Sequence, residues 1–131
     1  GKTAGGGVGL VAASDYAIAT ENAACRLSEL AVGIGPFVVG PVIERKIGHA
    51  AFQAMALDAD WRDAAWARRH GLYARVVEAH AELNDAVAAF AARLAAANPE
   101  ATAGIKRVCW EGTEPTDALL ADPAATGGRL G

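Results

Sequence analysis

Three consecutive glycines, Gly5 to Gly7, open a segment whose small apolar residues predict a helix over residues 6–13. Inside a helix each glycine costs about 1 kcal/mol relative to alanine, so core packing explains a run of them poorly. At a helix start, glycines let another group approach the backbone, where free N–H groups and the helix dipole favour negative charge. We therefore expect this helix start to hold a phosphate, a carboxylate or an oxyanion formed during a reaction. A close-packed turn without a ligand is the alternative.

A single carboxylate, Glu29, is the second candidate for chemistry. It lies within residues 27–32, between apolar neighbours, and leads into a Gly- and Pro-containing loop at residues 33–36. Carboxylates in apolar surroundings can exchange protons near neutral pH. A helix-capping or solvated glutamate is the alternative, and the pairing with the glycine run is what favours a catalytic role.

Two phosphate-binding patterns are matched only weakly. The run Gly7-Val-Gly-Leu-Val-Ala12 fits the G-x-G-x-x-A pattern of dinucleotide-binding turns, and an acidic residue, Glu29, follows at the expected distance. That pattern should follow a hydrophobic strand, but only four residues precede the glycines. Lys2-Thr3 imitates the end of a phosphate-binding loop, yet glycines intervene before the helix. A dinucleotide-binding domain therefore remains a distant alternative.

Composition excludes several other classes. Hydrophobic residues make up 53% of the 131 positions and charged ones 21%, which argues against intrinsic disorder. The net charge of −3, without a basic block, predicts no nucleic-acid partner and no membrane partner. His49, His70 and His80 lack metal-ligand spacing, so no metal site is predicted. Cys25 and Cys109 are interpreted as small packing residues. We expect a single domain located in the cytoplasm.

The elements that position the candidate residues follow from hydrophobic spacing and from Gly and Pro. Extended segments are predicted over residues 15–20, 25–28 and 72–77. Helices are predicted over residues 6–13, 40–47, 49–57, 61–70, 80–97 and 100–111, and another from 113 to 120. Residues 122–131 are too rich in Gly and Ala to assign. These few short strands cannot form a sheet large enough to support so many helices. We therefore expect further sheet-forming sequence upstream.

In this order and spacing, the motifs resemble the crotonase superfamily of enoyl-CoA hydratases and isomerases. The resemblance covers about residues 1–110 and is carried by Ala4-Gly-Gly-Gly7, Asp15-Tyr-Ala-Ile-Ala19, Ser28-Glu29, Gly33-Ile-Gly-Pro36, Arg45-Lys-Ile-Gly48 and the stretch over residues 64–77. It implies an α/β fold of the crotonase type, a spiral of ββα units. Residues 1–78 would be the second half of that core and residues 79–131 a truncated C-terminal helical region, with the N-terminal half absent. The run over residues 33–41 looks closest to methylglutaconyl-CoA hydratase-like sequences.

The resemblance also implies a reaction. In this family two backbone N–H groups hold the thioester oxygen of an acyl-CoA while it becomes an enolate, and Gly6 matches one of them. Hydratases of the family add water across the α,β double bond with two glutamates. Glu29 matches the second glutamate, and the first would fall at Gly9. We therefore expect Glu29 and Gly6 to be the catalytic residues.

Substrate contacts and assembly are inferred from the same resemblance. Gly5, Gly9, Pro36 and Phe37 match substrate-binding positions, although hydratases usually have Gly where Phe37 stands. No cofactor is expected beyond the coenzyme A of the substrate, and a homo-oligomer, either a trimer or a dimer of trimers, is implied for the full-length form.

The leading prediction is thus an enoyl-CoA hydratase. One alternative is an isomerase that uses a single glutamate, and another is a non-catalytic remnant or interaction subunit. Residues 1–131 alone are expected to be inactive or nearly so.

Overall fold

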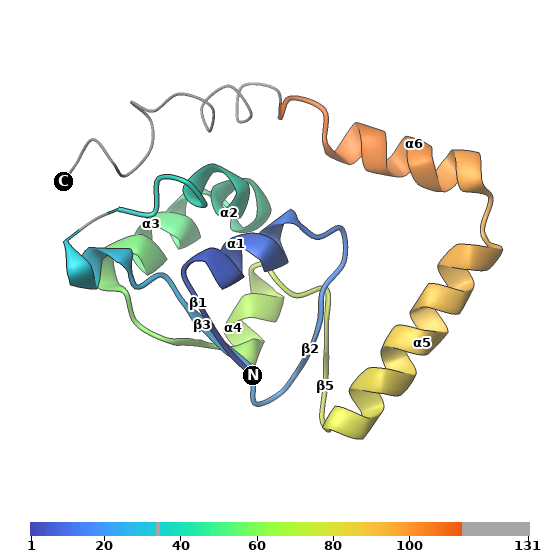
Figure 1. The fold of residues 1–131 in the computed structure, drawn as a ribbon, viewed down its shortest axis with the longest axis horizontal. Coiled ribbons are helices and arrows are strands. Elements are labelled where there is room, and N and C mark those ends of the chain that lie inside the picture. The colour runs from blue at the N-terminus through green and yellow to red at the C-terminus, as the bar shows by residue number, and fades with distance from the viewer. Residues whose placement is uncertain (34, 114–131) are drawn as a thin grey trace.

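A computed structural model describes residues 1–33 and 35–113 (Figure 1). The strands are β1 (Lys2–Ala4), β2 (Ile18–Thr20), β3 (Ala24–Arg26), β4 (Arg62–Asp63) and β5 (Arg75–Val77). The helices are α1 (Gly6–Ala13), the 3-10 helix η1 (Glu29–Val32), α2 (Gly40–Ile47), α3 (His49–Asp58), α4 (Ala64–Arg69), α5 (His80–Ala96) and α6 (Pro99–Cys109). The described chain is therefore of the mixed α/β class that the sequence predicts.

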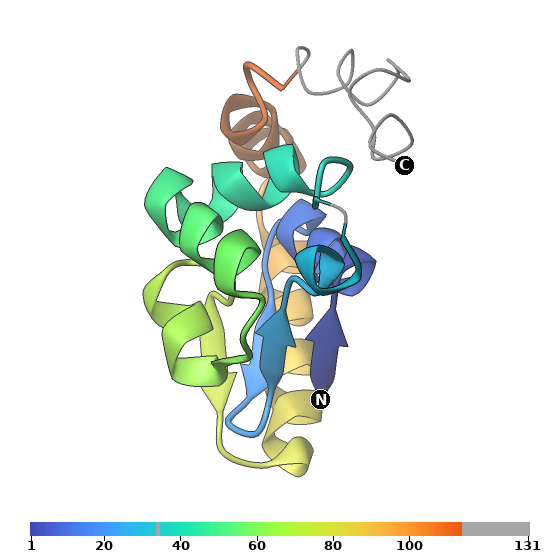
Figure 2. The ribbon, with the colours of Figure 1, turned by 90° about the vertical axis from the view of Figure 1, so that its left-hand side faces the viewer.

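Two small sheets form the centre of the fold. In the first, β3 lies between β1, which is parallel to it, and the antiparallel β4; in the second, β2 and β5 pair in parallel. Thr3 of β1 stands opposite Cys25 of β3. Parallel neighbours need a crossover connection, and α1 lies in the connection between β1 and β3. Figure 2 shows β1 and β3 side by side, with α1 and η1 just beyond the end to which both arrows point.

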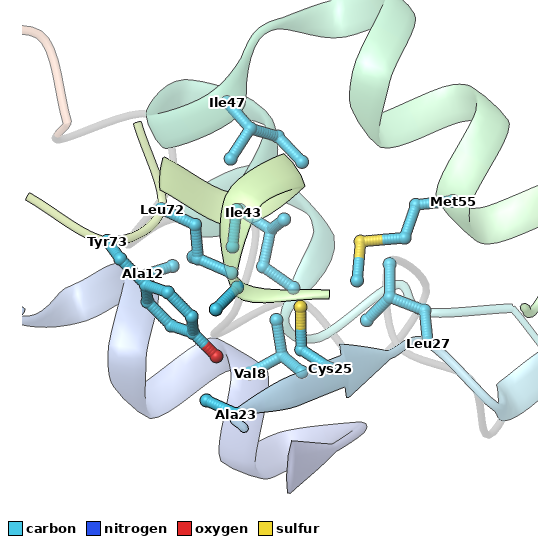
Figure 3. Close-up of a cluster of buried hydrophobic side chains, with 12 residues drawn as sticks. Val8, Ala12, Ala23, Cys25, Leu27, Ile43, Ile47, Met55, Leu72 and Tyr73 are labelled. Carbon is cyan, nitrogen blue, oxygen red and sulfur yellow. The ribbon is translucent and has the colours of Figure 1, made fainter. Parts of the chain in front are cut away.

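The core lies between these strands and helices α1 to α4. Val8 and Ala12, one turn apart on α1, face it. The largest fully buried side chains are Leu27, Ile43, Met55, Leu72, Val8 and Cys25. They come from five separate segments of the chain and meet in one cluster (Figure 3). This cluster holds α2 and α3 against the strands that carry the candidate site.

Most helices agree with the sequence prediction. Residues 6–13 and 40–47 are helical with the expected bounds. Helices α3 and α5 differ from the prediction by one residue at the C-terminal end, and α6 begins one residue earlier and ends two residues earlier than predicted. The extended segments are shorter than predicted. The helix expected from residue 113 and the unassigned residues 122–131 lie, apart from Thr113, outside the described part of the chain.

The helix predicted over residues 61–70 is wrong in its first part. Arg62 and Asp63 instead form β4, with Arg62 opposite Cys25 of β3. The Asp63 side chain then accepts a hydrogen bond from the Trp66 backbone N–H at 2.8 Å, which caps α4 and sets its start at Ala64. Pairing with a distant strand thus overrides a locally helical pattern.

Helix α5 leads away from the core, and α6 turns back toward the end of α1 (Figure 1). The ring of Phe90 on α5 stacks on Tyr16, with ring centroids 4.1 Å apart. Asp15 accepts a hydrogen bond from Trp110 Nε1 at 2.8 Å and pairs with Lys106 of α6 at 2.9 Å. Both contacts lower the pKa of Asp15, and the one with Lys106 has the larger effect. No helix in the described residues has both the length and the apolar character needed to cross a bilayer.

Met55 on α3 provides a test of the core. Its side chain is fully buried, whereas Leu57 on the same helix is 65% exposed. We expect Met55→Ala to lower the free energy of unfolding by about 2–4 kcal/mol, because it leaves a cavity, and Leu57→Ala by less than about 1 kcal/mol. Chemical denaturation of both variants measures the difference. Equal losses in the two variants would contradict the packing described for α3.

Tyr73 and Cys25 predict an alkaline dependence of stability. Burial, followed by the nearby Cys25 thiol, raises the pKa of Tyr73 from 10.0 to about 12. Its hydroxyl points in among Val8, Ala23 and Cys25 (Figure 3). Between pH 10 and pH 12 the unfolded chain loses the phenol proton of Tyr73, while the folded chain keeps it. The stabilisation is therefore complete below pH 10 and is lost as the pH rises toward 12.

Tyr73→Phe should remove this contribution to the loss of folding stability at alkaline pH, which is of order 2 kcal/mol. Denaturation curves recorded from pH 9 to 12 make the comparison. An unchanged profile in Tyr73→Phe would show that the buried phenol does not contribute.

Candidate active site

The ends of two parallel strands bring Glu29 to the glycine run. β1 leads directly into Gly5 and α1, while β3 leads through two residues into Glu29. Parallel strands end at the same edge of their sheet, which is where sites form in such folds. The Gly5 N–H donates to the Arg26 carbonyl at 3.1 Å, so the pairing of the two strands continues to the helix start. Candidate residues far apart in sequence are thus placed together.

Contact with Glu29 explains why residue 5 is glycine. The φ angle of Gly5 is +53°, a conformation that L side chains rarely adopt. A Cβ built on Gly5 would lie 3.1 Å from Glu29 Oε1, so the carboxylate lies directly against this residue. Gly7 has a packing reason as well, because a Cβ there would lie 2.7 Å from Thr3 Cγ2 of β1.

Gly6 differs from its neighbours. A Cβ built on Gly9 would lie 2.6 Å from Val39 Cγ1, so this glycine too makes a close contact. A Cβ built on Gly6 would meet nothing within 4 Å. Packing among the described residues therefore accounts for the other glycines of the run but not for Gly6. An open backbone at this position fits the approach of a ligand, as the sequence predicts.

The backbone N–H groups at this helix start are free to bind. The Gly5 carbonyl accepts the first intrahelical bonds, from Val8 at 3.0 Å and from Gly9 at 3.3 Å. The N–H groups of Gly6 and Gly7 donate to no acceptor within the described residues, and no side chain caps the helix. Unpaired donors at the positive end of a helix dipole favour an anion. The arrangement can therefore stabilise negative charge on an oxygen atom.

Glu29 places a proton carrier beside these donors. Its side chain is half-buried, and Oε2 is shielded from solvent without a hydrogen-bond partner in the part of the chain described. No described cation forms an ion pair with it. Burying a carboxylate oxygen unpaired costs free energy, and such groups are typical of binding and catalytic sites. Negative-charge stabilisation and proton transfer are thus both available at one edge of the sheet.

The remaining residues predicted to bind substrate are Gly9 on α1 and Pro36 and Phe37 in the loop before α2. The Phe37 ring folds against Gly35 and is partly exposed, and the Pro36 carbonyl accepts from Gly40 N–H at 2.7 Å. Gly9 is buried under Val39. Contact of these residues with a substrate stays a prediction. Within residues 1–33 and 35–113, no group of three or more His, Cys, Asp or Glu is placed to hold a metal ion.

Val39 is the neighbour of the site that sequence reasoning missed. Its side chain fills the space beside Gly9. The sequence feature that pointed to a close neighbour was Gly9 itself, because a glycine inside a helix is unfavourable unless another group occupies the space of its side chain. Which group fills that space depends on tertiary contacts, so local sequence did not identify Val39.

Comparisons with known proteins identify the family of the chain. The sequence model of a family described as enoyl-CoA hydratase/isomerase matches residues 1–121. Bacillaene synthase dehydratase PksH of Bacillus subtilis is 44% identical over 57 residues, which are 44% of this chain and 22% of that protein. Similarity to methylglutaconyl-CoA hydratases in particular stays a prediction.

Solved structures give the same fold. An enoyl-CoA hydratase from Mycobacterium avium superposes with a TM-score of 0.84 at 30% identity, over 99% of this chain and 58% of that one. An enoyl-CoA hydratase/isomerase from Marinobacter aquaeolei superposes with a TM-score of 0.79 at 32% identity, over 95% of this chain and 47% of that one. The chain thus spans about half the length of these enzymes, and its fold is of the crotonase type. Because the family model matches nearly the whole length of the chain, the chain belongs to the enoyl-CoA hydratase/isomerase family.

Proposed function

We propose that the protein containing this chain acts on acyl-CoA thioesters through a stabilised enolate. The observation that carries the proposal is the open backbone of Gly6 beside the Glu29 carboxylate. The thioester oxygen accepts a hydrogen bond from the Gly6 N–H as negative charge develops on it. One preorganised donor of this kind lowers a barrier by roughly 3 kcal/mol.

Hydration of an enoyl-CoA is the leading reaction. The oxygen of water bonds to the β-carbon, Glu29 accepts the proton released from that water, and a proton is delivered to the α-carbon as the enolate collapses. A single carboxylate can serve as base and then as acid. Support comes from relatives named as hydratases and from one named as a dehydratase, the reverse direction of the same reaction.

Double-bond migration is the second candidate, and the contact at Gly9 favours it. Position 9, where the resemblance places the first hydratase glutamate, carries no carboxylate, and Val39 fills the space beside it. Isomerisation needs one carboxylate, because the proton taken from the γ-carbon returns to the α-carbon while the double bond shifts. A non-catalytic subunit is the remaining alternative. Trimeric assembly belongs to this proposal through the resemblance, and a cytoplasmic location through the composition of the chain.

Replacement of the carboxylate tests the proton carrier. In the complete protein that carries these residues, Glu29→Gln should reduce kcat about 10²- to 10⁴-fold with enoyl-CoA substrates, because the amide cannot accept a proton. The fold should be retained, since the side chain keeps its shape. Exposed Glu21, in the turn between β2 and β3, is the matched control, and Glu21→Gln should keep full activity. Wild-type turnover by Glu29→Gln would exclude the assigned role.

Paired glycine substitutions separate binding from packing. Gly6→Ala should leave the unfolding temperature nearly unchanged, because the protein leaves room for a Cβ there, but should lower kcat/KM by crowding the oxyanion. Gly5→Ala should lose about 1–3 kcal/mol of stability through its positive φ and its contact with Glu29. Thermal melts and steady-state kinetics on both variants make the comparison. Full activity in Gly6→Ala would count against an oxyanion role for Gly6.

A further inference from the structure

The Glu29 carboxylate and the Val39 isopropyl group each lie against a glycine at the start of α1. The Glu29 carboxylate lies against Gly5, and the Gly9 N–H donates to the Gly5 carbonyl, which places Gly9 one helix turn later. A Cβ built on Gly9 would lie 2.6 Å from Val39 Cγ1 and 3.0 Å from Val39 Cβ. The Val39 side chain therefore occupies the volume that any side chain at position 9 would need.

Val39 is held firmly in that position. The preceding turn is closed by the bond from Gly40 N–H to the Pro36 carbonyl, and the Val39 carbonyl accepts from Ile43 N–H at 3.1 Å in the first turn of α2. Gly40 in turn lies close to the Phe52 ring of α3, where a Cβ would come within 3.0 Å. A β-branched side chain on such a backbone has few rotamers through which to move aside.

We propose that Val39 determines how Glu29 partitions between water addition and double-bond migration, an inference that rests on the proposed function. An ordered water needs two to four polar partners, and an isopropyl group supplies none. With Val39 in place, neither a second carboxylate nor a well-held water has room beside Gly9. The Val39 side chain therefore lowers the share of proton transfer from water relative to proton transfer from carbon to carbon by Glu29.

The test measures both products in the complete protein that carries these residues. Val39→Ala opens the space beside Gly9, and Val39→Thr keeps the shape but adds a hydroxyl. Each should raise the ratio of hydrated to migrated product from an enoyl-CoA roughly tenfold, the effect of about one gained hydrogen bond. The neighbouring Val38, 52% exposed, is the control, and Val38→Ala should keep the wild-type ratio.

A stability cycle tests the contact without any turnover. Gly9→Ala should destabilise the protein when Val39 is present and much less in combination with Val39→Ala. Additive effects in this cycle would overturn the contact and the inference with it. Coupling in the cycle together with an unchanged product ratio would show that Val39 only packs, which overturns the inference but leaves the proposed function intact. Absence of turnover with every enoyl-CoA tried, in the wild type as well, would overturn both.

Discussion

Parallel pairing of β1 with β3 is the constraint on which the candidate site depends. The strand ladder extends to Gly5, whose N–H donates to the Arg26 carbonyl, so the chain enters α1 and η1 from one edge of one sheet. Without that pairing, the free N–H groups of the helix start and the Glu29 carboxylate would have no common position. The buried cluster behind the sheet, from Val8 to Leu72, keeps the two strands and the helices in register.

The glycine run serves this geometry in two different ways. Close contacts with Glu29, Thr3 and Val39 require small residues at positions 5, 7 and 9. Gly6 alone is open, and its N–H has no acceptor among the described residues. The loss of helix stability that several glycines bring is therefore offset partly by packing and partly by the capacity to bind developing negative charge. A single open residue among packed ones distinguishes this helix start from a merely compact turn.

The same contacts relate the site to the rest of the family. Relatives named as hydratases share the fold over about half of their length, and the family model matches residues 1–121 of this chain. At position 9 it departs from the two-glutamate pattern, and the space is closed by an apolar side chain rather than left vacant. The packing of Val39 against Gly9, one helix turn from the residue that Glu29 contacts, is therefore where this chain departs from the pattern that the resemblance implies.

Local sequence was sufficient for the bounds of most helices and for naming the candidate residues of the site. Pro41 near the start of α2 and Gly48 at its end set those bounds through backbone geometry alone, and the glycine run and Glu29 were identified by residue type and spacing. Tertiary structure decided the rest, because the deciding contacts join segments distant in sequence. It turned residues 62–63 into a strand, laid Glu29 against Gly5, left Gly6 open and filled the space beside Gly9 with Val39. Such contacts depend on how strands and helices pack, and no local pattern encodes them.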